Sequence, residues 1–476
     1  MRTPAGTLAP MAQRPARIVR FSVVLTVTMA LAACGGGGGD SEPRRSSASC
    51  GLAEFRRASK PVEITMWHQM GSNNGRVFTD IVAGFNRSQR EVHVTLVDQS
   101  AETSALPKFR AGLTTGDVPD VIQLEETALQ TMIDSQATVP VQACVDADHY
   151  SLADYLPKVV GYYTVQGALR SMPYNPSNPI LFYNKNAFAK AGLDPNRPPQ
   201  TLAEVREFSQ RIVASGAAEH GISLRIAEFF TEFWSSKNGQ EYANNGNGRT
   251  RRATAADLDN PTQRTVWTWW HDMVTSGLAL NTGGEPGSIT HLLAIAAGDA
   301  AMTIEGSGAL GPIVNVIKSG EYPDMEVGTG PMPGVRAGGG VQTAEGSLYI
   351  VARKDPAKRG AAWQFIKYLD STEQLIRLHL ETGYVPIRRS VADAPAVQAR
   401  WASDPNYRVS YDQLLSGPTT LATTGPVIGD FLGVRAAVVD GITSMLSDRA
   451  SPRAALAATQ RRADAVIAAY NERVGG

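Results

Sequence analysis

PVEITMWHQMGSNNGRVFTDIVAGFNRSQREVHVTLV, residues 61–97, is the most informative segment for the fold class. Apolar and polar side chains alternate over Pro61–Trp67 and over Glu91–Val97, as in a β-strand, and Ile81–Phe85 between them falls in a helical pattern. A further strand is predicted at Val118–Leu124. Strands that alternate with helices in this way form mostly parallel sheets with helices on both faces, so we predict an α/β fold.

The rest of the chain adds a second, more helical region. Val205–Ala214 and Thr265–Thr275 are amphipathic, and we predict no strand between them. Apolar strands return at Ala300–Ile304 and Leu348–Ala352. A chain that passes from strand-rich to helix-rich and back to strand-rich sequence predicts two lobes joined by several crossings, with a hinge and a ligand cleft between them.

The length of the chain also favours two lobes, because 476 residues exceed what one hydrophobic core usually supports. We assign residues 61–172 plus 309–356 to lobe 1 and residues 173–308 plus 357–476 to lobe 2. The segment Pro173–Pro179 contains three prolines, each of which lacks the backbone donor that a regular strand uses. We therefore predict an irregular loop there that crosses between the lobes.

The amino terminus has the layout of a secretory signal. Four arginines and no acidic residue precede an apolar run at Phe21–Leu31, which is too short to cross a bilayer. Small residues then precede Cys34 in a pattern that resembles the lipobox of bacterial lipoproteins; the alternative is an ordinary cleaved signal beside an unrelated cysteine. We predict a signal peptide at residues 1–33, a lipid on Cys34 and a flexible linker over residues 34–60, so that the protein is extracytoplasmic and anchored to the cell membrane.

Cys50 and Cys144 remain once Cys34 is assigned to lipidation. An even pair in an oxidising compartment predicts a disulfide between the end of the linker and lobe 1, with free thiols as the alternative. The sequence contains no CxxC or HxxxH spacing, so we predict no metal site and no cofactor.

The overall charge is balanced, with 45 Lys and Arg against 45 Asp and Glu, and 43% of the residues are hydrophobic. These values are typical of a soluble globular protein. The basic residues are scattered and form no stripe of the kind that binds nucleic acid, so we exclude a nucleic-acid partner.

Several short motifs follow one another in a fixed order. They are Trp67-His68-Gln69-Met70, Phe85-Asn86, Gly116-Asp117-Val118-Pro119-Asp120-Val121, Tyr183-Asn184-Lys185, Ala191-Gly192-Leu193-Asp194-Pro195, Gly298-Asp299-Ala300-Ala301-Met302 and Thr382-Gly383-Tyr384-Val385-Pro386. In this order they resemble family 1 of the extracellular solute-binding proteins, most of all its glycerol-3-phosphate-binding receptors, over about residues 62–470.

The resemblance implies a type II periplasmic-binding-protein fold, with hinged lobes, mixed sheets and an interlobe cleft. It also implies a monomeric receptor and not an enzyme. Such a receptor captures a small hydroxylated solute and delivers it to the transmembrane permease subunits of an ABC importer.

The resemblance further implies ligand-binding residues. Three of them agree with the family: Glu126 as a carboxylate that accepts bonds from ligand hydroxyls, Ser177 as a polar contact and Tyr384 as a ring beside the ligand. The positions that differ from the glycerol-3-phosphate receptors are Glu102 for a tyrosine, Gly306 beside Ser307 for a serine, Glu345 for a backbone glycine, Leu202 for a tryptophan and Val427 for an arginine near the phosphate.

These differences change the expected ligand. An apolar Val427 cannot offer a phosphate the planar donors of an arginine, and the carboxylates nearby would repel a dianion. We therefore expect a neutral or cationic hydroxylated ligand: a sugar, a polyol or a glycerol derivative with a bulkier head, glycerophosphodiesters included.

Aromatic residues supply further candidates. Trp67 and His68 stand at the end of the first strand, and strand carboxyl ends border ligand crevices in open α/β sheets. For His68 a hydrogen-bonded structural role is the alternative. Trp234 is our candidate for a wall of the cleft, because rings from this middle segment stack on sugars in the family that the chain resembles. Core packing, which the helical spacing of Phe229–Trp234 favours, is the alternative.

Two other classes of protein stay open. A surface-anchored glycoside hydrolase could use Glu126 with Glu345 or Glu305, but that chemistry needs a carboxylate separation that a sequence does not give. No GxSxG elbow, Walker loop or HExxH helix indicates another enzyme. The remaining alternative is an adhesion or signalling lipoprotein that keeps the receptor fold.

Overall fold

The structure is a computed structural model, and it describes residues 49–99, 105–285, 287–322 and 325–475. The chain divides into two units, residues 1–45 and 46–476, and all described residues belong to the second. The predicted signal peptide, Cys34 and Glu102 lie outside the described residues. Across the described ranges, no helix combines the length and the apolar character needed to cross a membrane.

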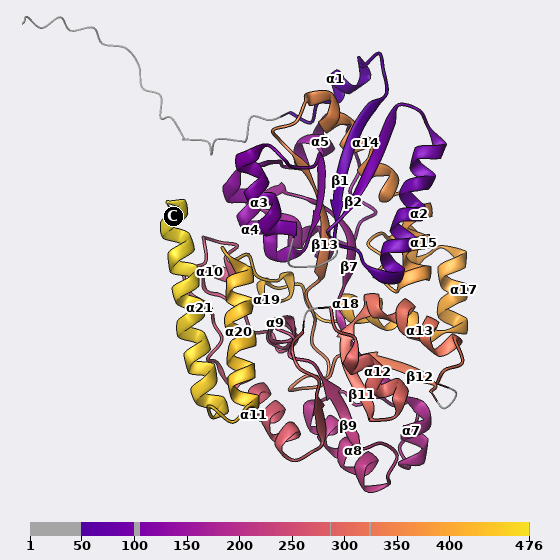
Figure 1. Ribbon diagram of the computed structural model, residues 1–476, viewed down its shortest axis with the longest axis vertical. Coiled ribbons are helices and arrows are strands. Elements are labelled where there is room, and N and C mark those ends of the chain that lie inside the picture. Colours follow the sequence, from indigo (N-terminus) through magenta and orange to yellow (C-terminus); the bar gives the residue numbers. More distant parts are fainter. Residues whose placement is uncertain (1–48, 100–104, 286, 323–324, 476) are drawn as a thin grey trace, which may run out of the picture. The chain divides into compact units, whose positions relative to one another are not determined.

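The first sheet is mixed and has the strand order β2-β1-β3-β13-β4, with β7 also paired to β13. Its strands are β1 Val62–His68, β2 Val92–Asp98, β3 Val121–Leu124, β4 Thr138–Val139, β7 Met172–Ser177 and β13 Ala344–Val351. β1 runs parallel to β2 and β3, whereas β13 runs antiparallel to β3, β4 and β7. We call this sheet and the helices that pack on it lobe 1 (Figure 1).

The strand-helix-strand unit predicted at residues 61–97 is β1, α2 and β2, with α2 at Ser72–Ser88. The apolar side chains of α2 recur every three or four residues and are all buried: Val77, Phe78, Ile81, Val82 and Phe85. They share one core with Ile64 and Met66 of β1. This stripe fixes α2 against the sheet.

The other helices of lobe 1 cover the same sheet. They are α1 Leu52–Arg56, α3 Ala105–Thr115, α4 Leu129–Ser135, α5 Gln142–Ala147, α6 Pro157–Tyr163, α14 Pro356–Leu369 and α15 Thr372–Thr382. α14 packs on β1 and β13, and α15 packs on α2. A short hairpin, β5 Thr164–Val165 and β6 Ala168–Leu169, follows α6.

The second sheet has the order β10-β9-β11-β8-β12. Its strands are β8 Pro179–Asn184, β9 His220–Leu224, β10 Ala279–Asn281, β11 Ala300–Gly306 and β12 Val327–Pro331. β9 is parallel to β10 and β11, and β8 is antiparallel to β11 and β12. We call this sheet and its helices lobe 2.

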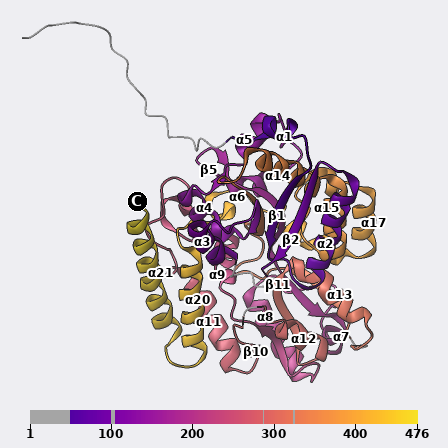
Figure 2. The ribbon, with the colours of Figure 1, turned by 45° about the horizontal axis from the view of Figure 1, so that its top comes forward.

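Most of the helices that follow or flank the second sheet bury a separate core rich in aromatic residues, whereas Leu292, Ala294 and Ile295 of the helix at Thr290–Ala297 belong to the core that also contains β1 and α2. They are α7 Lys185–Lys190, α8 Leu202–Ala214, α9 Phe229–Lys237, α10 Asn244–Asn247, α11 Pro261–Thr275, α12 Thr290–Ala297, α20 Phe431–Leu446 and α21 Pro452–Val474. α20 and α21 lie side by side, as Figure 1 and Figure 2 both show, and α11 packs on them.

Shorter helices connect the two sheets. They are α13 Leu310–Lys318, α16 Arg389–Ala392, α17 Pro395–Ser403, α18 Val409–Leu415 and α19 Leu421–Thr424. α13 follows β11 of the second sheet but packs on α2 and α15 of lobe 1. α18, which comes after the lobe 1 helices, packs on β8 and β12.

The prediction that no strand separates α8 from α11 is wrong, because β9 lies between them. The segment is short and begins His220-Gly221, which weakens the strand signal in the sequence. Gly221 serves a close approach between β9 and α8, since a Cβ at this position would lie 2.1 Å from the Cβ of Ser209. Gly221 therefore weakens the strand signal in the sequence and also allows β9 to pack closely against α8.

The prediction of an irregular loop at Pro173–Pro179 is also wrong, because β7 and β8 occupy almost all of it. β7 is an edge strand that pairs only with β13, with a register shift between Gly346 and Ser347. An edge strand needs only half of its backbone donors, so the prolines are tolerated. The crossing between the sheets is consequently short and lies between Ser177 and Pro179.

Besides β7, whose residues 173–177 we assigned to lobe 2 although the strand pairs in the first sheet, the structure differs from the predicted division into lobes at two places. We assigned residues 309–356 to lobe 1, but β12 lies in the second sheet. We assigned residues 357–476 to lobe 2, but α14 packs on β1 and α15 on α2. Both segments lie next to crossings, where the sequence pattern does not say which sheet an element joins.

The predicted linker is too long at its carboxyl end. α1 begins at Leu52, and its buried Leu52 and Phe55 pack toward α14. Cys50 and Cys144 form a disulfide that joins the residue before this turn to α5, with a Cα–Cα distance of 4.9 Å. The folded part therefore starts near Cys50 and not after residue 60.

Candidate functional site

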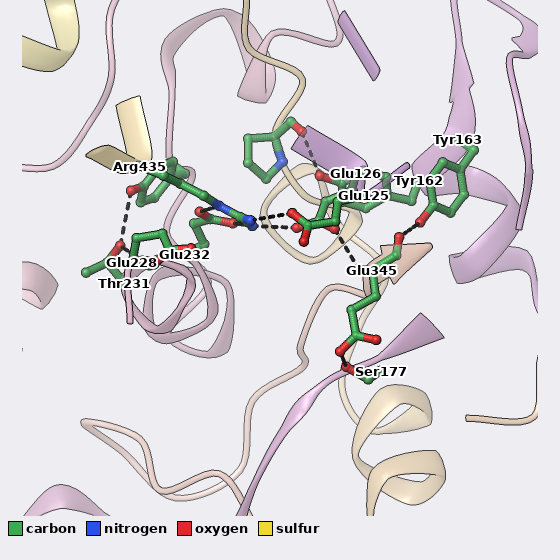
Figure 3. A network of polar contacts seen from close by, with 12 residues as sticks. Glu125, Glu126, Tyr162, Tyr163, Ser177, Glu228, Thr231, Glu232, Glu345 and Arg435 are labelled. Atoms are coloured by element: carbon green, nitrogen blue, oxygen red, sulfur yellow. Dashed lines mark hydrogen bonds and ion pairs between the residues drawn. The ribbon is translucent and has the colours of Figure 1, made fainter. Parts of the chain in front are cut away.

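A buried polar network lies where the loop after β3 meets the start of β13 and the helices α9 and α20 (Figure 3). At its centre, the Glu126 carboxylate accepts a hydrogen bond from the Glu345 amide at 2.6 Å and one from the Arg435 guanidinium at 2.5 Å. The side chain of Glu126 is 2% exposed. One carboxylate thus links three segments that are far apart in the sequence.

Arg435 of α20 contacts three carboxylates at once. Its guanidinium binds Glu232 of α9 through two bonds of 2.7 and 2.9 Å, and it binds Glu126 at 2.5 Å and Glu125 at 3.3 Å. Glu125 and Glu126 belong to lobe 1, whereas α9 and α20 pack in lobe 2. The cluster therefore ties the two lobes together, and its carboxylates outnumber its guanidinium three to one.

The excess of carboxylates has an electrostatic consequence. Burial raises the pKa of Glu232 to about 7, although Arg435 acts in the opposite direction. Burial would lower the pKa of Arg435, but Glu232 and Glu126 outweigh it and raise that pKa well above its usual value. The guanidinium consequently stays charged at neutral pH.

Glu345 adopts a backbone conformation that side chains rarely take, with φ at 71°. Its carbonyl accepts a bond from the Tyr163 hydroxyl at 2.7 Å, and its carboxylate accepts one from Ser177 at 2.5 Å. The glycine found here in the receptors that the chain resembles suits this conformation without strain. A strained non-glycine residue held by surrounding bonds is typical of functional sites.

Gly306 closes this side of the network from β11. A Cβ added there would lie 3.1 Å from the Ser177 hydroxyl and 3.2 Å from the Glu345 carboxylate. The site therefore combines Glu126 from the end of β3, Ser177 and Glu345 from the paired strands β7 and β13, and Gly306 from the second sheet.

Two tyrosines of α6 support the network. The Tyr162 hydroxyl donates to the Pro426 carbonyl at 2.9 Å, and Tyr163 donates to Glu345 as described above. Burial raises the pKa of both tyrosines well above the ordinary value, so that both hydroxyls remain protonated donors. Val427, next to Pro426, is 2% exposed and supplies no polar group.

Tyr384 and Ser307 lie next to each other at the neighbouring crossing. A Cβ on Gly308 would lie 2.9 Å from the Tyr384 ring, and one on Gly383 would lie 2.6 Å from the Ser307 carbonyl. The Ser307 hydroxyl is buried and has no hydrogen-bond partner among the described residues. It follows Gly306 directly, so a ligand group in the site could accept its proton.

The remaining candidates pack in cores. Trp234 is 1% exposed, and its indole donates to the Pro333 carbonyl at 3.0 Å, so core packing describes it better than a cleft wall. Leu202 is 3% exposed within the same core. Trp67 belongs to a smaller core of lobe 1, where the Lys108 ammonium lies 4.8 Å from its ring centre.

His68 is buried at the end of β1, and its ring meets the edge of Phe78 at 5.2 Å between ring centres. Burial lowers the pKa of His68, and its Nδ1 has no hydrogen-bond partner within the described part of the chain. His68 therefore packs in the core of lobe 1, and its Nδ1 makes no hydrogen bond with the described residues.

The sequence analysis did not predict that Arg435 and Glu232 belong to the site, although the sequence around each of them is unusual. Arg435 is the only charged residue between Asp430 and Asp440, in an apolar helix, and Glu232 stands inside the aromatic segment Phe229–Trp234. Charged residues on buried helix faces almost always have a charged partner. The two residues could therefore have been paired, though not with Glu126.

The third carboxylate considered for hydrolysis, Glu305, is already engaged by an arginine and a histidine. It accepts bonds from Arg225 at 2.7 Å, from His291 at 2.8 Å and from the Gly306 amide at 2.6 Å. Burial alone would raise its pKa, but Arg225 and His291 lower it to about 2. A carboxylate that stays ionised at neutral pH cannot act as the general acid of a glycosidase.

No group of three or more His, Cys, Asp and Glu side chains is arranged to hold a metal ion in the described ranges.

The fold defined by these two sheets is that of periplasmic sugar and solute receptors. It is similar to UgpB from Mycobacterium tuberculosis in complex with glycerophosphocholine, with a TM-score of 0.71 and 20% identity over 86% of this chain and 98% of that one. It is also similar to the sugar-binding protein MalE from Xanthomonas citri, with a TM-score of 0.70 and 21% identity over 87% and 99% of the two chains.

The sequence comparisons agree with the fold. A family model for bacterial extracellular solute-binding proteins matches residues 80–408, and the chain belongs to this family. The sn-glycerol-3-phosphate-binding periplasmic protein UgpB of Yersinia pseudotuberculosis is 29% identical over 418 residues, which cover 86% of this chain and 93% of the relative. The UgpB of Brucella abortus is 28% identical over 421 residues, 87% and 95% of the two chains.

Proposed function

We propose that this protein is the lipid-anchored, extracytoplasmic receptor of an ABC importer and that it captures a small neutral or cationic hydroxylated solute between its lobes. The observation that carries the proposal is the meeting of Glu126, Ser177 and Glu345 within 2.6 Å hydrogen bonds beside Gly306 of the second sheet. Carboxylates and a hydroxyl are acceptors and donors for sugar or polyol hydroxyls. A solute held there contacts both lobes and favours their closure.

The charges near this site oppose a phosphate monoester. Arg435 is the buried guanidinium of the cluster, and its donors are already engaged by Glu126 and Glu232. A dianion would have to displace a carboxylate and stay close to the others. A cationic or uncharged head meets no such cost.

Two of the structurally similar proteins bind solutes of this kind. The UgpB of Mycobacterium tuberculosis is in complex with glycerophosphocholine, a glycerol derivative with a cationic head, and the Xanthomonas citri protein binds a sugar. We infer a ligand from this range, a sugar, a polyol or a glycerophosphodiester. Permease recognition would follow closure, with the receptor acting as a monomer.

The anchoring part of the proposal rests on the sequence before the folded part. Residues 1–33 would be removed as a signal peptide, Cys34 would carry the lipid and the residues up to Cys50 would serve as a tether. Labelling with a radioactive fatty acid tests this step, because the label should be lost in Cys34→Ala and retained in Cys50→Ser.

Isothermal titration with a panel of sugars, polyols and glycerophosphodiesters tests the binding function. We expect saturable 1:1 binding of at least one member, weaker binding of glycerol-3-phosphate, and recovery of the bound solute unchanged. Glu126→Gln should abolish binding, whereas Glu219→Gln, at an exposed position of lobe 2, should not. Conversion of a solute to product, or no binding to any member, would refute the proposal.

A further inference from the structure

A pocket of about 470 Å³ lies apart from the network around Glu126. Its walls are the end of α9, the segment between β12 and β13, and the segment that contains α19. The lining residues are Ser236, Lys237, Asn238, Gly239, Glu241, Arg336, Gly339, Gly340, Pro418, Thr420, Leu421, Ala422 and Thr423. No residue of the Glu126 network is among them, so the two sites are distinct.

Lys237 is the unusual member of this lining. It is the last residue of α9 and is 7% exposed, yet its ammonium forms no hydrogen bond or ion pair with any described residue. Burial lowers the pKa of Lys237 to about 8, with no compensating partner. The Nζ atom itself is not sealed from solvent, so its positive charge is open to the pocket that Lys237 lines and can meet an anion there.

A second cation lines the same pocket. The Arg336 guanidinium is held by Asn238, with its Nε 2.9 Å from the side-chain oxygen and an Nη 3.0 Å from the carbonyl. A Cβ on Gly334 would lie 2.7 Å from the Arg336 carbonyl and 3.1 Å from Lys237 Cε, so the Arg336 backbone and the Lys237 side chain approach each other at Gly334. Glu241 is the single acidic residue of the lining, and it pairs with neither cation.

We propose that this pocket binds a small oxyanion, a carboxylate or a phosphate group, between Lys237 and Arg336. The ammonium supplies a compact point charge, and the guanidinium, already oriented by Asn238, supplies a planar donor edge. The neighbouring Thr420 and Thr423 bond each other at the start of α19, which fixes the opposite wall. The inference goes beyond the solute-receptor function and does not depend on it.

The test measures the NMR signal of the Lys237 side chain in the full-length protein while an anion is added. Protein labelled with ¹³C at the lysine ε-carbon is titrated with sodium phosphate and, separately, with sodium acetate, at an ionic strength held constant with chloride. We expect one lysine signal, identified by its absence in Lys237→Arg, to shift saturably with one of the two anions. The arm that responds distinguishes phosphate from carboxylate.

The pH dependence provides a second readout. An anion next to Lys237 favours the ammonium, so saturation should raise the midpoint pH of the Lys237 signal. Affinity for acetate, which stays ionised in this range, should be constant between about pH 6 and 8 and fall by up to about tenfold per pH unit above pH 8, because the neutral amine must first take up a proton.

Arg336→Gln keeps the proposal testable if Lys237→Arg does not fold, since Arg336 is exposed. It should weaken saturation at least about tenfold, as expected for the loss of a charged hydrogen bond. Arg462→Gln, at an exposed arginine paired with Asp440, should leave affinity unchanged. A Lys237 signal that responds to neither anion, or that moves no more than that of exposed Lys318, would overturn the proposal.

Discussion

Glu345 and Glu126 face each other across two antiparallel strand ends, and the amide of the first donates to the carboxylate of the second at 2.6 Å. The antiparallel pairing of Ser347 with Leu124 sets this register. Glu345 comes two residues before Ser347 and Glu126 two residues after Leu124, so the two glutamates lie opposite each other. The carboxylates proposed to bind the solute are thus positioned by main-chain geometry. Arg435 then connects Glu126 to lobe 2.

Replacement of Arg435 by methionine should destabilise the protein strongly. It leaves Glu126 and Glu232, at 2% and 0% exposure, without a buried cation, and removal of one partner from such a cluster costs about 3–5 kcal/mol. Urea unfolding at pH 7 measures the loss. The control Arg462→Met breaks an exposed pair with Asp440 and should cost less than about 1 kcal/mol. Equal losses would show that the cluster adds no stability.

Glu232 should make stability depend on pH in an unusual direction. Its pKa is about 7 in the folded protein against 4.5 as the ordinary value, so the folded state binds more protons between these pH values. Stability from this group is therefore fully present below about pH 4.5 and is lost as pH rises to about 7. Relative to Glu232→Gln, the wild type should lose stability between pH 5 and 7, whereas Glu219→Gln, at an exposed position, should follow the wild type. A parallel course of wild type and Glu232→Gln would contradict the raised pKa.

Glu345 should lower the stability of the protein through its strained backbone and raise its affinity for the solute through its carboxylate. In Glu345→Gly the strain at φ 71° disappears, so this variant should be more stable than Glu345→Ala by about 1 kcal/mol. Both variants lose the bond to Ser177 and should bind the solute at least about tenfold more weakly. Thermal unfolding and isothermal titration separate the two effects. If Glu345→Gly bound the solute with full affinity, the Glu345 carboxylate would not be part of the binding site.

Reduction of the bond between Cys50 and Cys144 should lower stability by about 2–5 kcal/mol, because it closes a loop with a sequence separation of 94. Urea unfolding of the wild type with and without a thiol reductant provides the measurement. Cys144→Ser should resemble the reduced protein and should show no further response to the reductant. An effect of reductant on Cys144→Ser as large as on the wild type would exclude the disulfide as its cause.

The strand-helix-strand unit of lobe 1 could be predicted from the sequence, but the strands β7 and β9 could not. β1, α2 and β2 follow from the local sequence pattern: α2 and β2 each bury one apolar face, and β1 is a mainly apolar strand whose last three residues are all buried. β9 is concealed by Gly221, and β7 contains prolines that only an edge strand accepts. In both cases a tertiary contact outweighs the local propensity.

The candidate site could be predicted only in part, for a related reason. Glu126, Ser177 and Glu345 were candidates from the family resemblance, and the structure brings these three together. Arg435 lies more than three hundred residues from Glu126, and no periodic pattern links the two positions. Trp234 has the chemistry of a sugar-stacking residue, yet its burial assigns it to packing.

A crystal structure of the protein with the tightest-binding member of the solute panel tests the central claim most directly. The account predicts an intact solute whose hydroxyls lie within hydrogen-bond distance of Glu126, Ser177 or Glu345, with residues of both lobes around it. A solute bound elsewhere, or one found cleaved between these carboxylates, would contradict it.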